Sequence, residues 1–512
     1  MFRTLALILA VGSMLMICGC PPQTPPSETP PEEAPEEAPV EAPVETPVET
    51  PVETPVETPV ETPVETPVET PVETPVETPI VPPVETPAEA AEVKDVDFSV
   101  AWCTDADPKI AAETAATDAM AGLGCSAKGL IFYEYYPKTV TGADDKQKEV
   151  PDTEKEKAIL PAIRSAAADV PVVGCRARSL VTGGTMLTNT VAVMAIGGEK
   201  VSCKAVKAEL DDDRQAVGRA IAEQLADVDA LKLVFALSEM KLSFETKEGV
   251  SVEDFIRGVL AETGDGVTLF GGNCMPNDYE TDKSGVQFLN DETLEGCVVA
   301  MGIGGPIAVH ANHTNEFTPS AETFTVTKAE DKWIYELDDR PASEVYREIR
   351  AMEADEEFTS DWQHPIGVIV AEDKVYLRMV LEEDKEKKGL KFVAAVPQGT
   401  KIKILKGGDD AAAIVNAAKE GIAESLAQAG DAKPLVALLS DCCARGMRLR
   451  EFRTADECEV AQAIKPALAD KGDVPIFGFY AWGELGPIAG VFNGLPCMYQ
   501  QHTFVSAVLT EE

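Results

Sequence analysis

The chain is poor in positive charge. Its 512 residues include 44 Lys and Arg against 88 Asp and Glu, which gives a formal net charge of −44 at pH 7. Segment 21–92 contributes eighteen Glu and no Lys or Arg, so much of the negative charge lies elsewhere in the chain. A surface of this sign repels phosphate backbones, which excludes a nucleic acid as partner.

Long hydrophobic runs are absent after the first twenty residues. Arg3 precedes an apolar run from Leu5 to Ile17, which is too short to span a hydrocarbon layer of about 30 Å and is typical of a signal peptide. The run ends in "ICGC", which resembles the bacterial lipobox, where cleavage precedes a cysteine that is then acylated. We expect a lipoprotein signal peptide over residues 1–19 and a lipid on Cys20. An ordinary secretory signal with incidental cysteines is the alternative.

These expectations place the protein in the cell envelope. The lipid would anchor it on the extracytoplasmic side, in the outer membrane or at the cell surface if the cell is Gram-negative. Residues 20–92 combine the lipidated Cys20 with a repeat of Pro-Val-Glu-Thr. Such a segment has no apolar face to bury and too many prolines for a helix or sheet, so we expect a disordered, extended stalk.

Dense cysteine and histidine patterns are also lacking. Ten cysteines are spread from Cys103 to Cys497 without paired CxxC spacings, and the chain has four histidines. We therefore expect no metal site and no cofactor. His310 and His313 lie in "HANHTNEF", which we interpret as a polar loop.

Catalytic motifs are equally sparse. The candidate nucleophiles Cys175, Cys274 and Cys442 each follow a predicted strand, but no G-x-S-x-G elbow is present. No catalytic constellation can be identified, and we expect that the protein is not an enzyme.

The folded part repeats one order of elements, helix–strand–helix–strand followed by a turn and a further strand. Strands of this order are far enough apart for helical crossovers between parallel neighbours. The helices are predicted at Ala111–Leu123, 155–168, Arg214–Leu225, Val252–Glu262, around 414–426 and 456–469. The strands include "GLIFYEYY", "PVVG", "LKLVFALS", "VTLFGG", "PLVALLS" and "PIFGFY".

Residues 324–405 differ from this pattern. Short strands rich in β-branched and aromatic residues alternate there with charged turns, which predicts antiparallel pairing. "PASEVYREI" is a predicted helix with Pro341 in its first turn. The predicted fold class is α/β, mixed α+β, with repeated units in two related halves joined by an antiparallel β region.

The turns after the strands carry the candidate ligand-binding residues. Glycines such as Gly478 and Gly483 allow close approach of a ligand, and Tyr480 and Trp482 could wall an apolar pocket. Glu484 could accept hydrogen bonds from an ammonium group, and Arg445 could pair with a carboxylate, which together suit an amino acid. Alternatively, Glu484 and Arg445 bind each other or the local backbone and only hold the loops.

The segments "VPVVGC", "ELDDRPASEVYREI", "LLSDCCARG" and "PIFGFYAWGELGP" resemble the FIST domain family of bacterial sensory proteins. The resemblance covers about residues 94–512 and implies a FIST N-like domain at 93–323 and a FIST C-like domain at 324–512. It also implies binding of small ligands, and it places family motifs on Cys442, Arg445, Gly478, Gly483 and Glu484. The chain departs from the family in "RARSLV" after Cys175 and in "QQHT" near its end.

The favoured function is a membrane-anchored, extracytoplasmic sensor of a small ligand such as an amino acid. Its partners would be that ligand, the membrane through the lipid anchor, and an unidentified protein that receives the signal, because no output module is present. A structural or interaction lipoprotein without a small ligand and a Cys-dependent hydrolase are the alternatives. An exposed apolar patch would favour the structural role, and a convergent Cys, His and carboxylate would favour the hydrolase.

Overall fold

The computed structural model describes residues 94–141, 147–183, 185–243, 249–264, 266–278, 282–353, 356, 358, 361–372, 374–407, 411–452, 458 and 460–512. The predicted signal peptide, the predicted lipidation site Cys20 and the predicted stalk lie outside the described residues. Within them, no helix combines the length and the apolar character needed to cross a bilayer.

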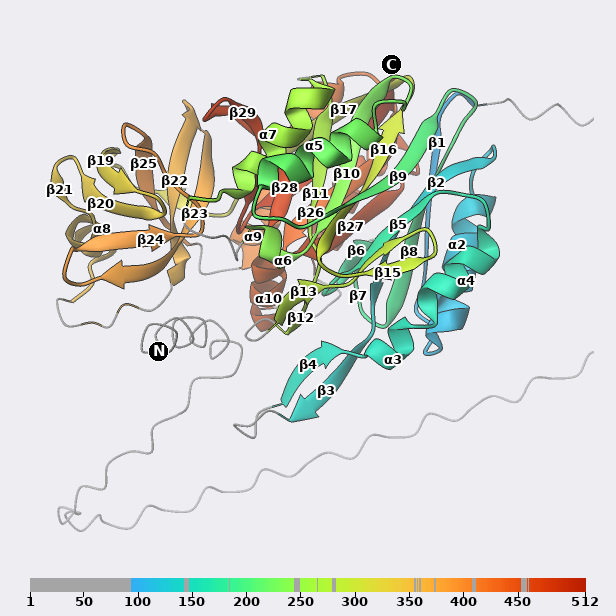
Figure 1. Cartoon of the computed structure of the whole chain (residues 1–512), viewed down its shortest axis with the longest axis horizontal. Helices are drawn as coiled ribbons and strands as arrows, with labels where there is room; N and C mark the ends of the chain where they lie inside the picture. The colour runs from blue at the N-terminus through green and yellow to red at the C-terminus, as the bar shows by residue number, and fades with distance from the viewer. Residues whose placement is uncertain are drawn as a thin grey trace, which may run out of the picture. The chain divides into compact units, whose positions relative to one another are not determined.

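Three α/β units share one strand order (Figure 1). In each unit an antiparallel strand lies between the first strand and a pair of parallel strands. The strands, in spatial order, are β1 (Asp97–Cys103), β8 (Thr190–Gly197), β2 (Ala127–Tyr135) and β5 (Val172–Arg176); β9 (Ser202–Glu209), β16 (Cys297–Gly304), β10 (Leu231–Ser238) and β11 (Thr268–Asn273); and β17 (Ile307–Thr314), β30 (Phe504–Glu511), β26 (Pro434–Cys442) and β27 (Ile476–Ala481). The recurring order predicted from the sequence is confirmed.

The units are joined in a closed ring by exchanged hairpins. One hairpin from each unit pairs with the outer strand of the parallel pair in another unit and so extends the sheet of that unit. The hairpin β6 (Leu180–Thr182)–β7 (Thr185–Leu187) extends the third unit at β27, β14 (Gln287–Leu289)–β15 (Glu292–Leu294) extends the first unit at β5, and β28 (Glu484–Phe492)–β29 (Leu495–Gln500) extends the second unit at β11. Because each exchange covers an edge strand, the three units depend on one another.

Each sheet has one face on a common core and the other under helices. Tyr133, Phe235 and Phe479 come from the three different units and meet in this core, where the rings of Tyr133 and Phe479 lie 4.4 Å apart. The covering helices are α2 (Pro108–Ala121) and α4 (Ile159–Ala166), α5 (Arg214–Gln224) and α7 (Val252–Thr263), and α9 (Ala411–Ala429) and α10 (Cys443–Phe452).

The helix boundaries have local causes. α2 begins with Asp107, which caps the backbone N–H of Lys109, and with Pro108, whose fixed φ suits the first turn. Its buried face is made of alanines, so α2 packs closely on the first unit. α7 begins with a capping box between Ser251 and Asp254.

A small antiparallel barrel is inserted into the third unit after β17 and occupies the left of Figure 1. Pairing of β22 with β25 closes it, which confirms the predicted antiparallel region. Its strands are β19 (Phe324–Glu330), β20 (Trp333–Leu337), β24 (Gly389–Phe392), β23 (Lys374–Asp384), β22 (Asp361–Ala371) and β25 (Lys401–Lys406), with the short β18 (Thr318–Pro319) and β21 (Arg340–Pro341) at its margins and α8 (Ala342–Arg350) packed against it.

One buried residue ties the barrel to the units. Arg378 on β23 is 1% exposed, forms an ion pair with Glu253 on α7 and donates to the carbonyl of Tyr499 on β29 at 3.2 Å. Since removal of one partner from such a pair leaves a buried charge uncompensated, Arg378 fixes how the barrel sits on the second and third units.

The structure corrects three details of the sequence analysis. "HANHTNEF" is not mainly a loop, because its first half belongs to β17. The backbone of this strand pairs with the antiparallel strand β30. The polar segment "DCCARG" after the predicted strand "PLVALLS" has the composition expected of a turn, but it is not a turn, because α10 begins at Cys443 directly after β26. Pro341 is the N-cap of α8 and not a member of its first turn.

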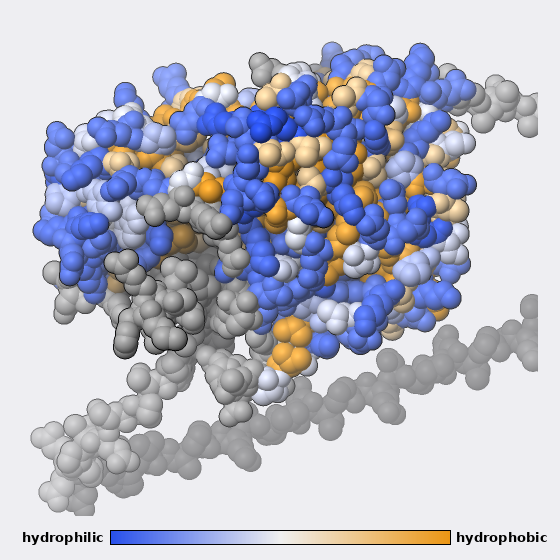
Figure 2. All heavy atoms as spheres, in the orientation of Figure 1, coloured by the Kyte–Doolittle hydropathy of each residue, from blue (hydrophilic) through white to orange (hydrophobic). Residues whose placement is uncertain are grey.

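The remaining elements are the hairpins β3 (Pro137–Thr141)–β4 (Gln147–Pro151) and β12 (Pro276–Asp278)–β13 (Asp282–Gly285), and the short helices α3 (Thr153–Glu156), α6 (Met240–Ser243), η3 (Val460–Ile464), α11 (Lys465–Leu468) and η4 (Ala469–Lys471). The face shown in Figure 2 is largely hydrophilic, with smaller hydrophobic patches between the charged residues. This agrees with the acidic composition of the chain.

Candidate functional site

The carboxyl ends of the three parallel pairs meet through backbone hydrogen bonds. The N–H of Met275 donates to the carbonyl of Arg176 at 2.8 Å, and the N–H of Trp482 donates to the carbonyl of Asn273 at 3.0 Å. The N–H of Tyr480 donates to the carbonyl of Ser179 at 3.1 Å. Ligands of open α/β sheets bind outside these strand ends, so the candidate site residues belong to this junction.

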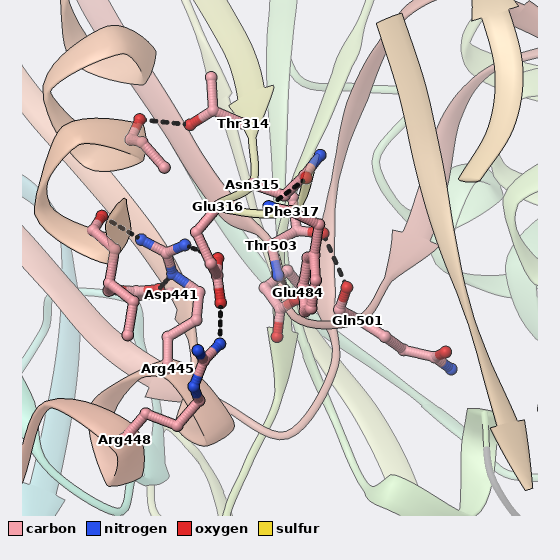
Figure 3. Close-up of polar contacts among 12 residues, drawn as sticks. Thr314, Asn315, Glu316, Phe317, Asp441, Arg445, Arg448, Glu484, Gln501 and Thr503 are labelled. Atoms are coloured by element: carbon pink, nitrogen blue, oxygen red, sulfur yellow. Dashed lines mark hydrogen bonds and ion pairs between the residues drawn. The ribbon is translucent and has the colours of Figure 1, made fainter. Parts of the chain in front are cut away.

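Arg445 lies in the first turns of α10 and is fully buried. It pairs with Glu316 and with Asp441, whose carboxylate it contacts at 2.7 Å, and it donates to the carbonyl of Ile414 at 3.0 Å (Figure 3). Arg448, one turn further, reaches the other oxygen of Glu316 at 2.8 Å. These contacts agree with the alternative that Arg445 holds local structure; its role toward a ligand stays a prediction.

Glu484 is the first residue of β28 and is also fully buried. One carboxyl oxygen accepts from the N–H of Thr503 at 3.2 Å, whereas Oε1 has no hydrogen-bond partner among the described residues. Burial, and next the thiol of Cys442, raise the pKa of Glu484 well above its usual range. Its position beside Cys442 therefore favours the neutral acid form of Glu484 more than an exposed position would.

The other predicted residues surround the same junction. Tyr480 is buried against Gly446, where a Cβ would lie 2.7 Å from the ring. Trp482 is half-buried, and its carbonyl accepts from the side-chain amide of Asn273 at 2.9 Å. Gly483 has a φ of +123°, which a residue with a side chain rarely adopts. The fold thus brings the seven residues into one region, and their contact with a ligand stays a prediction.

The recurring glycine of the strand ends has a packing role. Gly174, Gly271 and Gly478 occupy equivalent positions in the three units, each opposite one residue of the parallel partner strand. A Cβ at Gly478 would lie 2.5 Å from Cβ of its partner Leu439. Cβs at Gly174 and Gly271 would likewise collide with their own partners. Glycine is therefore needed at these three positions because the neighbouring parallel strand approaches so closely.

Arg445, Arg448, Glu316 and Asp441 form a buried arginine cluster. A cavity of about 290 Å³ is lined by residues that are next to this cluster in the sequence. Glu316 belongs to the arginine cluster, whereas its neighbours Asn315 and Phe317 line the cavity. The other walls come from β17, α9 and the barrel, so the cavity lies where the barrel meets the third unit. Its further lining residues are His313, Thr314, Pro319, Ile369, Glu372, Lys374, Val375, Lys403 and Glu420.

His313 lines this cavity, and one of its two ring nitrogens has no hydrogen-bond partner among the described residues. The residue is 2% exposed, and its Nε2 lies 3.3 Å from the carbonyl oxygen of Val375. Its Nδ1 has no hydrogen-bond partner among the described residues. Burial lowers the pKa of His313 to about 4, so the ring is neutral at physiological pH. With the proton on Nε2, where a carbonyl can accept it, Nδ1 is left as an acceptor.

A larger cleft of about 900 Å³ lies at the carboxyl end of β5. The hairpin β3–β4, the helices α3 and α4, and the exchanged hairpin β14–β15 surround it. Arg176 lies at its floor with a side chain that is 1% exposed, paired with Glu156. We did not predict this cleft from the sequence. The available signal was the segment "RARSLV", which departs from the family at this strand end.

Of the ten cysteines in the described part of the chain, seven are buried. Burial raises the pKa of Cys442, Cys175 and Cys274, which disfavours the nucleophilic thiolate at each candidate position. Among the described residues, no group of three or more His, Cys, Asp or Glu is placed to hold a metal ion.

Comparison with known proteins identifies the family. A sequence model of the FIST N domain matches residues 150–340, and a model of the FIST C domain matches residues 342–487. No curated protein matches. Among solved structures, a cyanuric acid hydrolase from A. caulinodans is similar over 81% of this chain and 99% of its own, with 10% identity and a TM-score of 0.30. Since the two domain models together match well over half of the sequence, the chain belongs to the FIST family of sensory domains.

Proposed function

We propose that this protein is a lipid-anchored sensor, on the extracytoplasmic side of the cell envelope, that binds an amino acid or a similar small zwitterion. The observation that carries the proposal is the cavity of about 290 Å³ between the barrel and the third unit. Its volume is close to the lower end of the range for small-molecule sites, and such sites often lie between structural units.

The lining of this cavity is complementary to a zwitterion. Lys403, whose Nζ also donates to the carbonyl of Ser320 at 3.0 Å, would supply positive charge for a carboxylate, whereas Lys374 is already paired with Glu424. Glu372 and Glu420 would supply negative charge for an ammonium group. His313 also lines the cavity, and its Nδ1, which is buried and has no hydrogen-bond partner among the described residues, would accept one N–H of the ligand. Apolar contact for a side chain comes from Phe317, Pro319, Ile369 and Val375. One small molecule would then satisfy groups on both sides of the cavity.

A ligand in this position would also connect two parts of the molecule. It would contact β17 and α9 on one side and barrel strands β22, β23 and β25 on the other. Binding that favours one barrel position over another shifts the population of that state, which is the physical requirement for a sensor. The resulting change would pass to a separate protein partner, and the function requires no catalytic step.

A thermal-shift screen of the full chain against the standard amino acids tests the proposal. We expect at least one compound to raise the melting temperature in a saturable manner, because a ligand of the folded state stabilises it by RT ln(1 + [L]/Kd). Lys403→Met should weaken that ligand about tenfold, the loss of one ionic contact. Lys401→Met, on the same strand but outside the cavity lining, is the matched control. The absence of any saturable shift would refute the proposal.

A further inference from the structure

At the floor of the 900 Å³ cleft, Arg176 lies between two buried carboxyl groups, Glu156 in the lining and Glu134 behind the lining. Arg176 donates to both oxygens of Glu156, at 2.7 and 2.6 Å, and to Oδ1 of Asn277 at 2.7 Å. Behind it lies Glu134, which is fully buried and has Oε1 3.9 Å from Nε of Arg176. One guanidinium thus faces two buried carboxyl groups.

The negative charge of Glu134 is not fully compensated by the groups around it. Neither of its carboxyl oxygens has a hydrogen-bond partner among the described residues. Burial, and next the charge of Glu156, raise the pKa of Glu134 well above its usual range, and Arg176 opposes this only in part. Burial beside Glu156 therefore favours the protonated form of Glu134 in the ligand-free structure. The other titratable groups affected by Glu134 are Cys175 and Tyr136.

The cations at the rim of the cleft have partners of their own. Lys157 contacts Glu154 at 2.6 Å, and Lys138 lies 3.8 Å from Asp152. Arg164 contacts Asp291 at 3.1 Å and also donates to backbone carbonyls. The floor gains a further acidic neighbour through Asn277, whose Nδ2 donates to Glu295 at 2.9 Å. The balance at the floor favours a cation over an anion.

We propose that this cleft is a second ligand site, separate from the zwitterion cavity, for an organic cation with an apolar body. The cationic head would pair with Glu156, Arg176 would pair with Glu134, and Glu134 would give up its proton to solvent. Charge balances in this exchange, because one cation enters and one proton leaves. The apolar body would lie on the buried side chains of Leu160, Val286 and Phe288.

Calorimetric titration of the full chain with benzamidine tests this site, with neutral benzamide and anionic benzoate as probes of similar shape. We expect saturable binding of benzamidine, at least tenfold tighter than of either analogue. Titrations in two buffers of different ionisation enthalpy should reveal net proton release. Glu134→Gln should abolish that release, because it removes the titrating group.

Two variants locate the binding. Glu156→Gln should weaken benzamidine at least tenfold, but it also removes a partner of buried Arg176 and could impair folding. Thr293→Trp avoids this difficulty, because Thr293 is an exposed residue of β15 that lines the cleft. It should block the cleft and abolish binding while the melting temperature stays unchanged.

Three results would overturn the proposal: no binding of benzamidine, binding of benzoate at equal or greater affinity, or unchanged binding in Thr293→Trp. A heat of binding that is independent of the buffer would overturn the proton exchange. Amino acid binding at the other cavity is measured separately, so either site can fail alone.

Discussion

Glu316 and Arg445 form a fully buried ion pair that connects the segment after β17 to helix α10. The two residues are far apart in the sequence, and the whole barrel lies between them. The pair therefore joins the two ends of the segment that forms the barrel, and it fixes one wall of the cavity of about 290 Å³ next to Asn315 and Phe317.

Arg445→Ala should lower the free energy of unfolding by about 3–5 kcal/mol, because it leaves buried carboxylates without their guanidinium. Urea denaturation measures the effect. Arg340→Ala is the matched control, since its ion pair with Glu348 is exposed and should be worth less than about 1 kcal/mol. Equal, small losses in both variants would show that Arg445 is not a structural anchor.

Glu484→Gln should stabilise the protein increasingly as the pH rises. The folded state keeps a proton on Glu484 that the unfolded chain loses above about pH 4.5, so the wild type is destabilised as the pH rises through that value. Gln resembles the neutral acid and removes this dependence, by at most about 1.4 kcal/mol per pH unit. Urea denaturation at several pH values, with exposed Glu113→Gln as background, tests this. A difference that is constant with pH would contradict it.

His313 should produce the opposite pH dependence. Its pKa is lowered from 6.5 to about 4 by burial, so its contribution to stability is complete above pH 6.5 and is lost as the pH falls toward 4. The wild type should lose roughly 3 kcal/mol more than His313→Gln over this range. Chemical denaturation at both ends of the range measures the loss. His310→Gln is the control, since His310 is only partly buried and should show a smaller effect.

Gly478→Ala should cost about 1–3 kcal/mol of stability, because the added Cβ has no room against Leu439. Gly266→Ala is the control: nothing lies within 4 Å of its added Cβ, and it should change stability by less than about 0.5 kcal/mol. Thermal unfolding compares the two variants. If Gly478→Ala is as stable as the wild type but loses ligand binding, then the glycine serves the ligand and not the strand pair.

Part of the candidate site could be predicted from the sequence. Arg445 and Glu484 were identified because each follows a predicted strand at a family motif, and both lie at the junction of the strand ends. Glu316 and His313 belong to a segment whose sequence is interpreted as a polar loop, after a metal site is weighed and set aside. Their positions depend on β17 pairing with the distant β30, which no local pattern indicates.

The sequence alone determined most of the helices and strands of this protein, with α10 and the end of β17 as exceptions. Hydrophobic periodicity located helices such as α5 and α7 to within a residue or two, and β-branched runs located the barrel strands, because these signals are local. Only the tertiary structure decided the hairpin exchange, the partners of Arg445 and Arg176, and the two cavities. Each of these depends on residues brought together from distant positions, and such contacts are selected by packing of the whole chain and not by any short segment.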